Sequence, residues 1–85
     1  MNLKEFIEKN KISFEEGSRN SSVTTLIGYA LYKGVSQDQL LEELEDEINE
    51  DGFIEDEIMR LWEYCKYRNY GNWWETEEAK SLYKF

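Results

Sequence analysis

Apolar side chains recur along this chain at the three- and four-residue spacing of an α-helix, and no proline interrupts the pattern. The clearest case runs from Val23 to Leu31, where five apolar residues share one face of a helix expected over residues 21–33. Gly34 follows directly, where many helices end on a left-handed residue that glycine adopts most easily. A chain patterned in this way is expected to fold as packed helices rather than as a sheet.

Shorter signals predict the elements around this helix. Before it, we expect a short helix over residues 3–7 and an extended connector, with room for a short strand, over residues 12–18. After it, we expect a helix that the capping box of Ser36 and Gln39 opens and that reaches Ile48, and then a long helix over residues 53–68. A turn at residues 69–72 and a last helix over residues 73–82, capped by Asn72 and Glu75, complete the chain. The predicted fold is all-α, one domain over residues 1–85 that forms a small compact bundle of four to five helices. The alternative is a winged-helix-like layout, in which residues 70–74 turn a small hairpin.

Charge is unevenly distributed along the chain, whose formal net charge is −9. Residues 37–57, called the acidic block below, hold eleven of the nineteen acidic residues and none of the ten basic ones. The rest of the chain therefore carries a net charge of +2. Since nucleic acids bind proteins through Lys and Arg, a nucleic acid would have to approach the chain outside the acidic block.

The acidic block has three interpretations: a solvated helix face, a docking face for a basic partner, or an imitation of DNA toward a basic partner. The partner-binding candidates are Glu42, Glu43, Asp46, Glu47 and Glu50. A metal site is not expected, because Mg²⁺ and Ca²⁺ need converging oxygens in a shaped loop.

Other absences in the sequence narrow the function further. There is no histidine, and the single cysteine, Cys65, lies on an apolar helix face without a neighbouring base. No glycine-rich phosphate loop and no long apolar segment occur. We therefore expect a non-enzymatic, cytoplasmic protein with no cofactor and no contact with a membrane.

The stretch from residue 60 to residue 74 interleaves aromatic and basic side chains and holds one acidic residue, Glu63. Single-stranded nucleic acids are held by aromatic rings that stack on bases, beside cations that follow the backbone. The candidates for this role are Arg60, Lys66, Tyr67, Arg68, Tyr70, Trp73 and Trp74. Trp62 follows the apolar face and is expected in the core. Trp73 and Trp74 are adjacent, so we expect one of them to be exposed.

A second candidate site is the segment Gly17-Ser18-Arg19-Asn20, which precedes the helix expected over residues 21–33. Unpaired N–H groups and partial positive charge at a helix N-terminus suit an anion, and an arginine can hold a phosphate in a bidentate manner. Arg19 and Asn20 are therefore candidate nucleic-acid ligands. An ordinary helix start with a solvent-exposed arginine is the alternative.

The spacing of several short motifs resembles the primase C-terminal domain family, a group of helical modules in phage, plasmid and mobile-element replication proteins. The motifs are Gly17-Ser18-Arg19-Asn20, then Ala30-Leu31 with Gly34-Val35-Ser36, then Leu40-Leu41, Ile48-Asn49 and Glu57-Ile58. The similarity covers about residues 12–67. A proline-containing segment of the family is replaced here by Phe53-Ile54.

The resemblance implies a role in DNA replication, with Arg19 and Asn20 as the polar positions of interest and Gly17 and Gly34 as structural ones. We expect a non-catalytic accessory subunit in priming, of a phage or mobile-element system, that binds single-stranded DNA or a partner polymerase, primase or helicase. The alternative is an acidic interaction module or a DNA-mimic inhibitor, which would bind a basic protein and not DNA.

Overall fold

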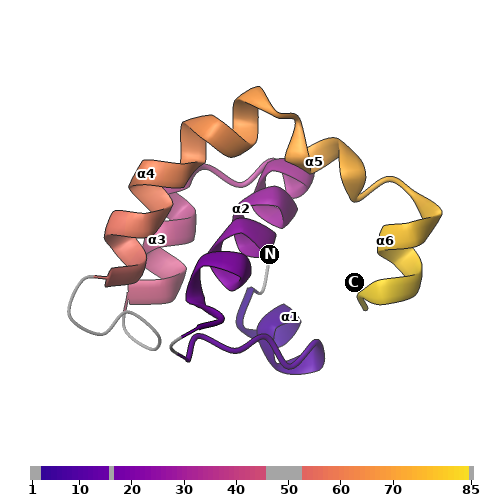
Figure 1. Cartoon of the computed structure of the whole chain (residues 1–85), viewed down its shortest axis with the longest axis horizontal. Coiled ribbons are helices and arrows are strands. Elements are labelled where there is room, and N and C mark those ends of the chain that lie inside the picture. Colours follow the sequence, from indigo (N-terminus) through magenta and orange to yellow (C-terminus); the bar gives the residue numbers. More distant parts are fainter. Residues whose placement is uncertain (1–2, 16, 46–52, 85) are drawn as a thin grey trace.

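The computed structural model describes residues 3–15, 17–45 and 53–84. This part of the chain folds into helices without a strand (Figure 1). The helices are α1 (Leu3–Lys9), α2 (Arg19–Lys33), α3 (Gln37–Glu45), α4 (Phe53–Tyr67), α5 (Tyr70–Trp73) and α6 (Glu77–Leu82). The predicted all-α bundle is confirmed. The winged-helix alternative is wrong, because residues 70–73 form a helical turn instead of a hairpin.

Helix α2 lies at the centre of the molecule and packs mainly against α4 and α5 (Figure 1). Its position follows from its side chains, since Val23, Leu26, Ile27 and Ala30 are fully buried. Burial of apolar surface of this extent is the main force that holds a small domain together. The long amphipathic segment recognised in the sequence is therefore the core helix of the bundle.

Helix α2 ends as its sequence predicts. Gly34 adopts a left-handed conformation with φ of 76°, and the N–H of Val35 donates to the carbonyl of Ala30 at 2.8 Å. The N–H of Gly34 donates to the carbonyl of Leu31 at 3.3 Å. These two bonds form a Schellman motif. Buried Val35 then leads the chain into the turn before α3.

The ends of the other helices agree with the sequence in part. Ser36 caps α3, because its Oγ accepts the N–H of Gln39 at 3.2 Å. The expected continuation of this helix to Ile48 lies outside the described residues. The predicted cap of the last helix is wrong: the N-cap of α6 is Thr76, not Asn72, and its Oγ1 accepts the N–H of Ala79 at 3.3 Å. Thr76 has an extended backbone, and its hydroxyl also donates to the carbonyl of Trp73 at 2.6 Å. It is a better N-cap than a residue inside another helical turn.

Helix α5 approaches α2 very closely, and glycine makes this approach possible. A Cβ atom on Gly71 would lie 3.0 Å from the Cβ of Leu31 and 3.1 Å from the backbone nitrogen of Tyr32. A Cβ atom on Gly28 would lie 3.0 Å from Nε1 of Trp74. Each of the two helices thus has a glycine where the other helix comes closest. The sequence predicted only a turn at residues 69–72 and did not predict this contact.

The two ends of the chain are joined through an aromatic cluster and an asparagine. The rings of Phe6 and Tyr29 stack at a centroid distance of 3.8 Å, and Trp74 meets Tyr29 edge-on at 5.1 Å. Asn10 also binds Lys84 through two hydrogen bonds: its Nδ2 donates to the Lys84 carbonyl at 2.9 Å, and its Oδ1 accepts the Lys84 N–H at 2.7 Å. These contacts attach α1 to α2 and to the segment after α6.

Candidate nucleic-acid interface

Arg19 and Asn20, the predicted anion-binding pair, lie in the first turn of α2 and bind other parts of the chain. Nε of Arg19 donates to the carbonyl of Phe14 at 2.9 Å. Nδ2 of Asn20 donates to Oε2 of Glu57 on α4 at 3.2 Å. Gly17 has a φ of 95°, a conformation that favours glycine in the loop before the helix. The geometry gives this motif a structural role in joining the loop and α4 to α2.

Glu57 connects this motif to Arg60, a residue of the aromatic and basic stretch. Nη2 of Arg60 lies 2.7 Å from Oε2 of Glu57, and Nε donates to Oε1 at 3.3 Å. The hydrogen bond from Arg60 lowers the pKa of the Glu57 carboxyl. The positive charge of Arg60 and the hydrogen bond from Asn20 lower this pKa further. The i, i+3 spacing of the ion pair is visible in the sequence, whereas its link to Asn20, 37 positions away, is not.

The first prediction concerns this network. A group with a lowered folded-state pKa stabilises the fold above its unfolded pKa, and this contribution is lost as the pH falls through the folded pKa. We expect Glu57→Gln to reduce stability at pH 7 and to leave a variant whose unfolding midpoint depends less on pH below about 4.5. Urea unfolding between pH 2.5 and pH 7 measures both effects. Glu63→Gln, on the same helix, is the control, and an equal response in the two variants would contradict the role of Glu57.

Four residues at helical spacing form an exposed stripe along α4 and its end: Arg60, Tyr64, Tyr67 and Arg68. Tyr67 is 84% exposed and Tyr64 is 48% exposed, so both rings face solvent. The guanidinium of Arg68 lies over the Tyr64 ring, 5.6 Å from its centroid. We call this set the α4 stripe. It places aromatic faces and cations side by side, as a single-strand platform requires.

Tyr70 supports the stripe from α5. Its ring meets that of Tyr64 edge-on at 5.9 Å. A hydrogen bond between the two hydroxyls lowers the pKa of Tyr64 and raises that of Tyr70. Tyr64 was not among the predicted ligands, although its spacing of four residues from both arginines was a usable signal. Tyr70 is half-buried, so it holds Tyr64 in place more than it offers a face of its own.

The two adjacent tryptophans differ in burial, although neither of them is fully exposed as one was expected to be. Trp73 is half-buried, and Trp74 is 2% exposed. Trp74 is therefore corrected from a candidate ligand to a core residue, because its ring is enclosed by Phe6, Tyr29 and Tyr83.

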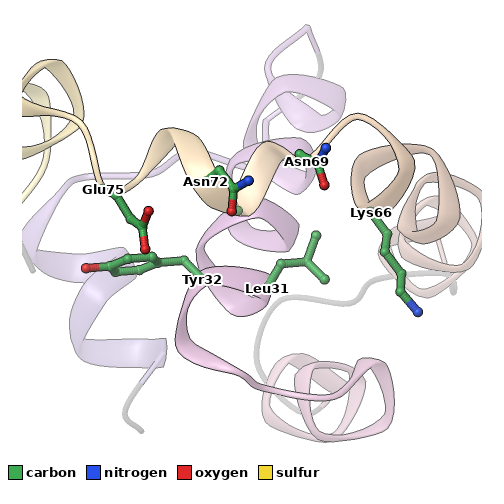
Figure 2. A pocket seen from close by; sticks show the side chains of 7 residues that line it. Leu31, Tyr32, Lys66, Asn69, Asn72 and Glu75 are labelled. Atoms are coloured by element: carbon green, nitrogen blue, oxygen red, sulfur yellow. The ribbon is translucent and has the colours of Figure 1, made fainter.

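Lys66 lies on a different side of α4 from the stripe and lines a pocket of about 200 Å³ (Figure 2). The other lining residues come from the end of α2 and from the segment around α5: Leu31, Tyr32, Asn69, Gly71, Asn72 and Glu75. Sequence reasoning assigned none of these six to a site. The helices that bring them together are joined by the close contact of Gly71 with α2, which no local pattern predicts.

The structure describes only part of the acidic block. Glu42 is exposed on α3, whereas Glu43 is half-buried and its Oε1 accepts the N–H of Leu3 at 3.5 Å. Asp46, Glu47 and Glu50 lie outside the described residues. A docking role stays a prediction for Glu42. Glu43 contacts the start of α1 and is less available to a partner.

Three other kinds of functional feature were sought in the described residues: a reactive cysteine, a metal site and a membrane-spanning helix. Cys65 is buried, as predicted, and burial raises the pKa of its thiol. Residues 3–15, 17–45 and 53–84 contain no group of three or more side chains placed to hold a metal ion. No helix in these ranges has the length and apolar character needed to cross a bilayer.

Comparison with known protein families gives a match. The family model for primase C terminal 1 (PriCT-1) matches residues 11–63, which is more than half of the chain. The chain belongs to the PriCT-1 family. Membership confirms the resemblance drawn from the motifs between Gly17 and Ile58, and it associates the chain with primases and replication proteins. No curated protein and no solved structure matches the chain.

The PriCT-1 match covers α2 and α3 completely and ends within α4. Arg19, Asn20, Glu57 and Arg60 thus belong to the part shared with the family. Tyr64, Tyr67 and Arg68 follow the matched residues. Their candidacy rests on their geometry in this structure.

Proposed function

We propose that this PriCT-1 protein is a non-catalytic accessory module of DNA priming that holds single-stranded DNA on the α4 stripe. The observation that carries the proposal is the exposed pair of tyrosines beside Arg68. Large aromatic rings in a domain of this size are ordinarily buried. Here 84% of Tyr67 is exposed and a guanidinium covers Tyr64, in a protein of a primase-associated family.

The distribution of charge supports the same surface. Residues 60–74 carry three basic residues and one acidic residue, Glu63, while the acidic block lies earlier in the chain. DNA repelled by the acidic block would be directed to the end of α4, where stacking on Tyr67 and a contact of Arg68 with phosphate add together on the stripe. Lys66 precedes Tyr67 on a different side of the helix and would contact a phosphate where the strand leaves the stripe. A partner polymerase, primase or helicase would supply the catalysis.

The second prediction tests this surface with labelled ten-nucleotide DNA. We expect Tyr67→Ala to weaken binding by about 1–3 kcal/mol, the contribution of one stacked base. We expect Lys66→Glu with Arg68→Glu to weaken it more and to reduce the slope of log affinity against log salt by about 1.4, the loss of two phosphate contacts on a single strand. Fluorescence anisotropy at several salt concentrations measures both quantities.

Lys84→Glu is the matched control, because this exposed lysine lies after α6, away from the α4 stripe. It is expected to retain the affinity of the unmodified protein within about twofold, apart from the general effect of charge. Absence of DNA binding at low salt would contradict the proposal. In that case the acidic interaction module becomes the better interpretation, and Glu42→Lys is the variant that examines it.

A further inference from the structure

The pocket beside Lys66 is a polar depression that the α4 stripe does not use. It lies where the end of α2 meets the corner between α4 and α5 (Figure 2). Its volume of about 200 Å³ is smaller than that of pockets for drug-sized ligands, which begin at about 300 Å³. It therefore suits a single ring system better than a complete nucleotide.

Four polar side chains surround this pocket, and they offer a complementary set of groups. Lys66 brings three donors, Glu75 brings only acceptors, and the amides of Asn69 and Asn72 bring both. Figure 2 shows Lys66 at one end and Glu75 at the other, with the two amides between them. None of the four makes a side-chain hydrogen bond or ion pair with another residue of the described ranges.

Asn69 illustrates why these groups are available to a ligand. It stands at the N-cap of α5, where an asparagine side chain usually accepts a backbone N–H. Here its backbone is left-handed, with φ of 57°, and its side chain makes no capping bond. The amide instead contributes to the lining of the pocket, next to the amide of Asn72.

The wall formed by α2 adds an aromatic surface. Tyr32 is half-buried and lies beside Glu75 in Figure 2, and Nζ of Lys33 lies 5.4 Å from the centroid of the Tyr32 ring. A flat aromatic surface, two amides and a carboxylate are the groups that recognise the edge and face of a nucleobase. Lys66 stands at the end of the pocket nearest α4, one residue before Tyr67 of the α4 stripe, where a phosphate could follow the base.

We propose that this pocket takes one unpaired base of a single DNA strand and selects bases that carry an exocyclic amine. The inference rests on the proposed function, which brings the strand to α4. Cytosine, adenine and guanine can each donate from an amine to the Glu75 carboxylate. Thymine offers only an N3–H between two carbonyl oxygens, and these oxygens repel a carboxylate. Glu75 is thus the specificity residue, and the two asparagines position the base edge.

The experiment compares labelled dC10 and dT10 by fluorescence anisotropy at pH 7.5 and low salt. The two strands have equal charge and equal length, so backbone contacts and nonspecific salt effects cancel in the ratio of their affinities. We expect dC10 to bind about fivefold more tightly, the lower end of the discrimination given by a well-placed carboxylate or amide pair, since the pocket is open to water. Glu75→Gln is expected to bring the ratio close to one, because a glutamine side chain can also donate to the carbonyls of thymine.

Glu78→Gln is the matched control, since it makes the same change of charge on an exposed residue of α6 outside the pocket. It is expected to keep the fivefold ratio. Equal binding of dC10 and dT10 by the unmodified protein, or an unchanged ratio in Glu75→Gln, would overturn the base pocket and leave the α4 stripe as the binding surface. Failure of both strands to bind would overturn the proposed function and this inference together.

Discussion

Replacement of Trp74 by alanine is expected to reduce the free energy of unfolding by about 3–5 kcal/mol, the usual cost of removing a large aromatic side chain from a core. Trp74 is 2% exposed, and its ring meets rings from α1, α2 and the segment after α6. Small domains are stable by only about 5–15 kcal/mol. The variant should therefore be partly unfolded at 37 °C. Urea unfolding followed by far-UV circular dichroism measures the loss.

Tyr67→Ala provides the matched control for this prediction. It also removes an aromatic ring, but from a residue that is 84% exposed, and we expect a change within about 0.5 kcal/mol. The two variants together distinguish an effect on folding stability from an effect on DNA binding. Tyr67→Ala should weaken DNA binding without losing structure, and Trp74→Ala should lose both structure and binding. A loss of less than about 1 kcal/mol for Trp74→Ala would show that the aromatic cluster does not hold the ends of the chain together.

The second large effect is expected for Gly71→Val. The new side chain would begin 3.0 Å from the Cβ of Leu31 and 3.1 Å from the backbone nitrogen of Tyr32. A side-chain end can rotate away, but a backbone atom inside α2 cannot, so α5 has to move off α2. Overpacking of this kind usually costs about 1–3 kcal/mol. The displacement would also separate Asn69 and Asn72 from Tyr32 and disrupt the pocket.

Asn72→Val is the control for this substitution, because it places the same β-branched side chain on the next residue of α5, which is exposed. Any cost of valine in a helical turn is common to both variants. The difference in unfolding free energy therefore measures the close contact of α5 with α2. Equal midpoints in urea would contradict the contact.

Local pattern was sufficient for the parts of the fold whose causes are local. The apolar spacing from Val23 to Leu31 predicted the buried face of α2, and Gly34 predicted its end. Ser36 predicted the cap of α3. These features depend on residues within a few positions of one another, so the sequence contains all that is needed to infer them.

The predictions that are wrong concern residues whose structure depends on contacts with distant parts of the chain. The turn expected at residues 69–72 is a helical turn pressed against α2, and this contact carries Trp74 into the core. With Trp74 inside, the expected helix from residue 73 does not form as one element, and α6 begins only at Glu77, after its N-cap Thr76. The spacing of Trp73 and Trp74 indicated that one of them would be exposed, but not which one.

The candidate site divides in the same way. The sequence predicted that aromatic and basic residues after Arg60 share a surface, and the i, i+4 spacing from Arg60 to Tyr64 and Arg68 accounts for the α4 stripe. It could not separate Lys66 from that stripe, nor bring Asn69, Asn72 and Glu75 to Tyr32. It also assigned Asn20 to a ligand, whereas the fold gives its amide to Glu57.

The sequence by itself determined that this protein is a small helical domain with a divided charge, because helical periodicity and composition are properties of the chain alone. It also carried the family motifs. Only the tertiary structure decided which aromatic rings face water and which polar groups meet. These outcomes depend on the packing of α5 and Trp74 against α2 and of α4 against the start of α2, between residues 37 to 46 positions apart. Such contacts form because burial favours them in three dimensions, and the order of residues along the chain does not record them.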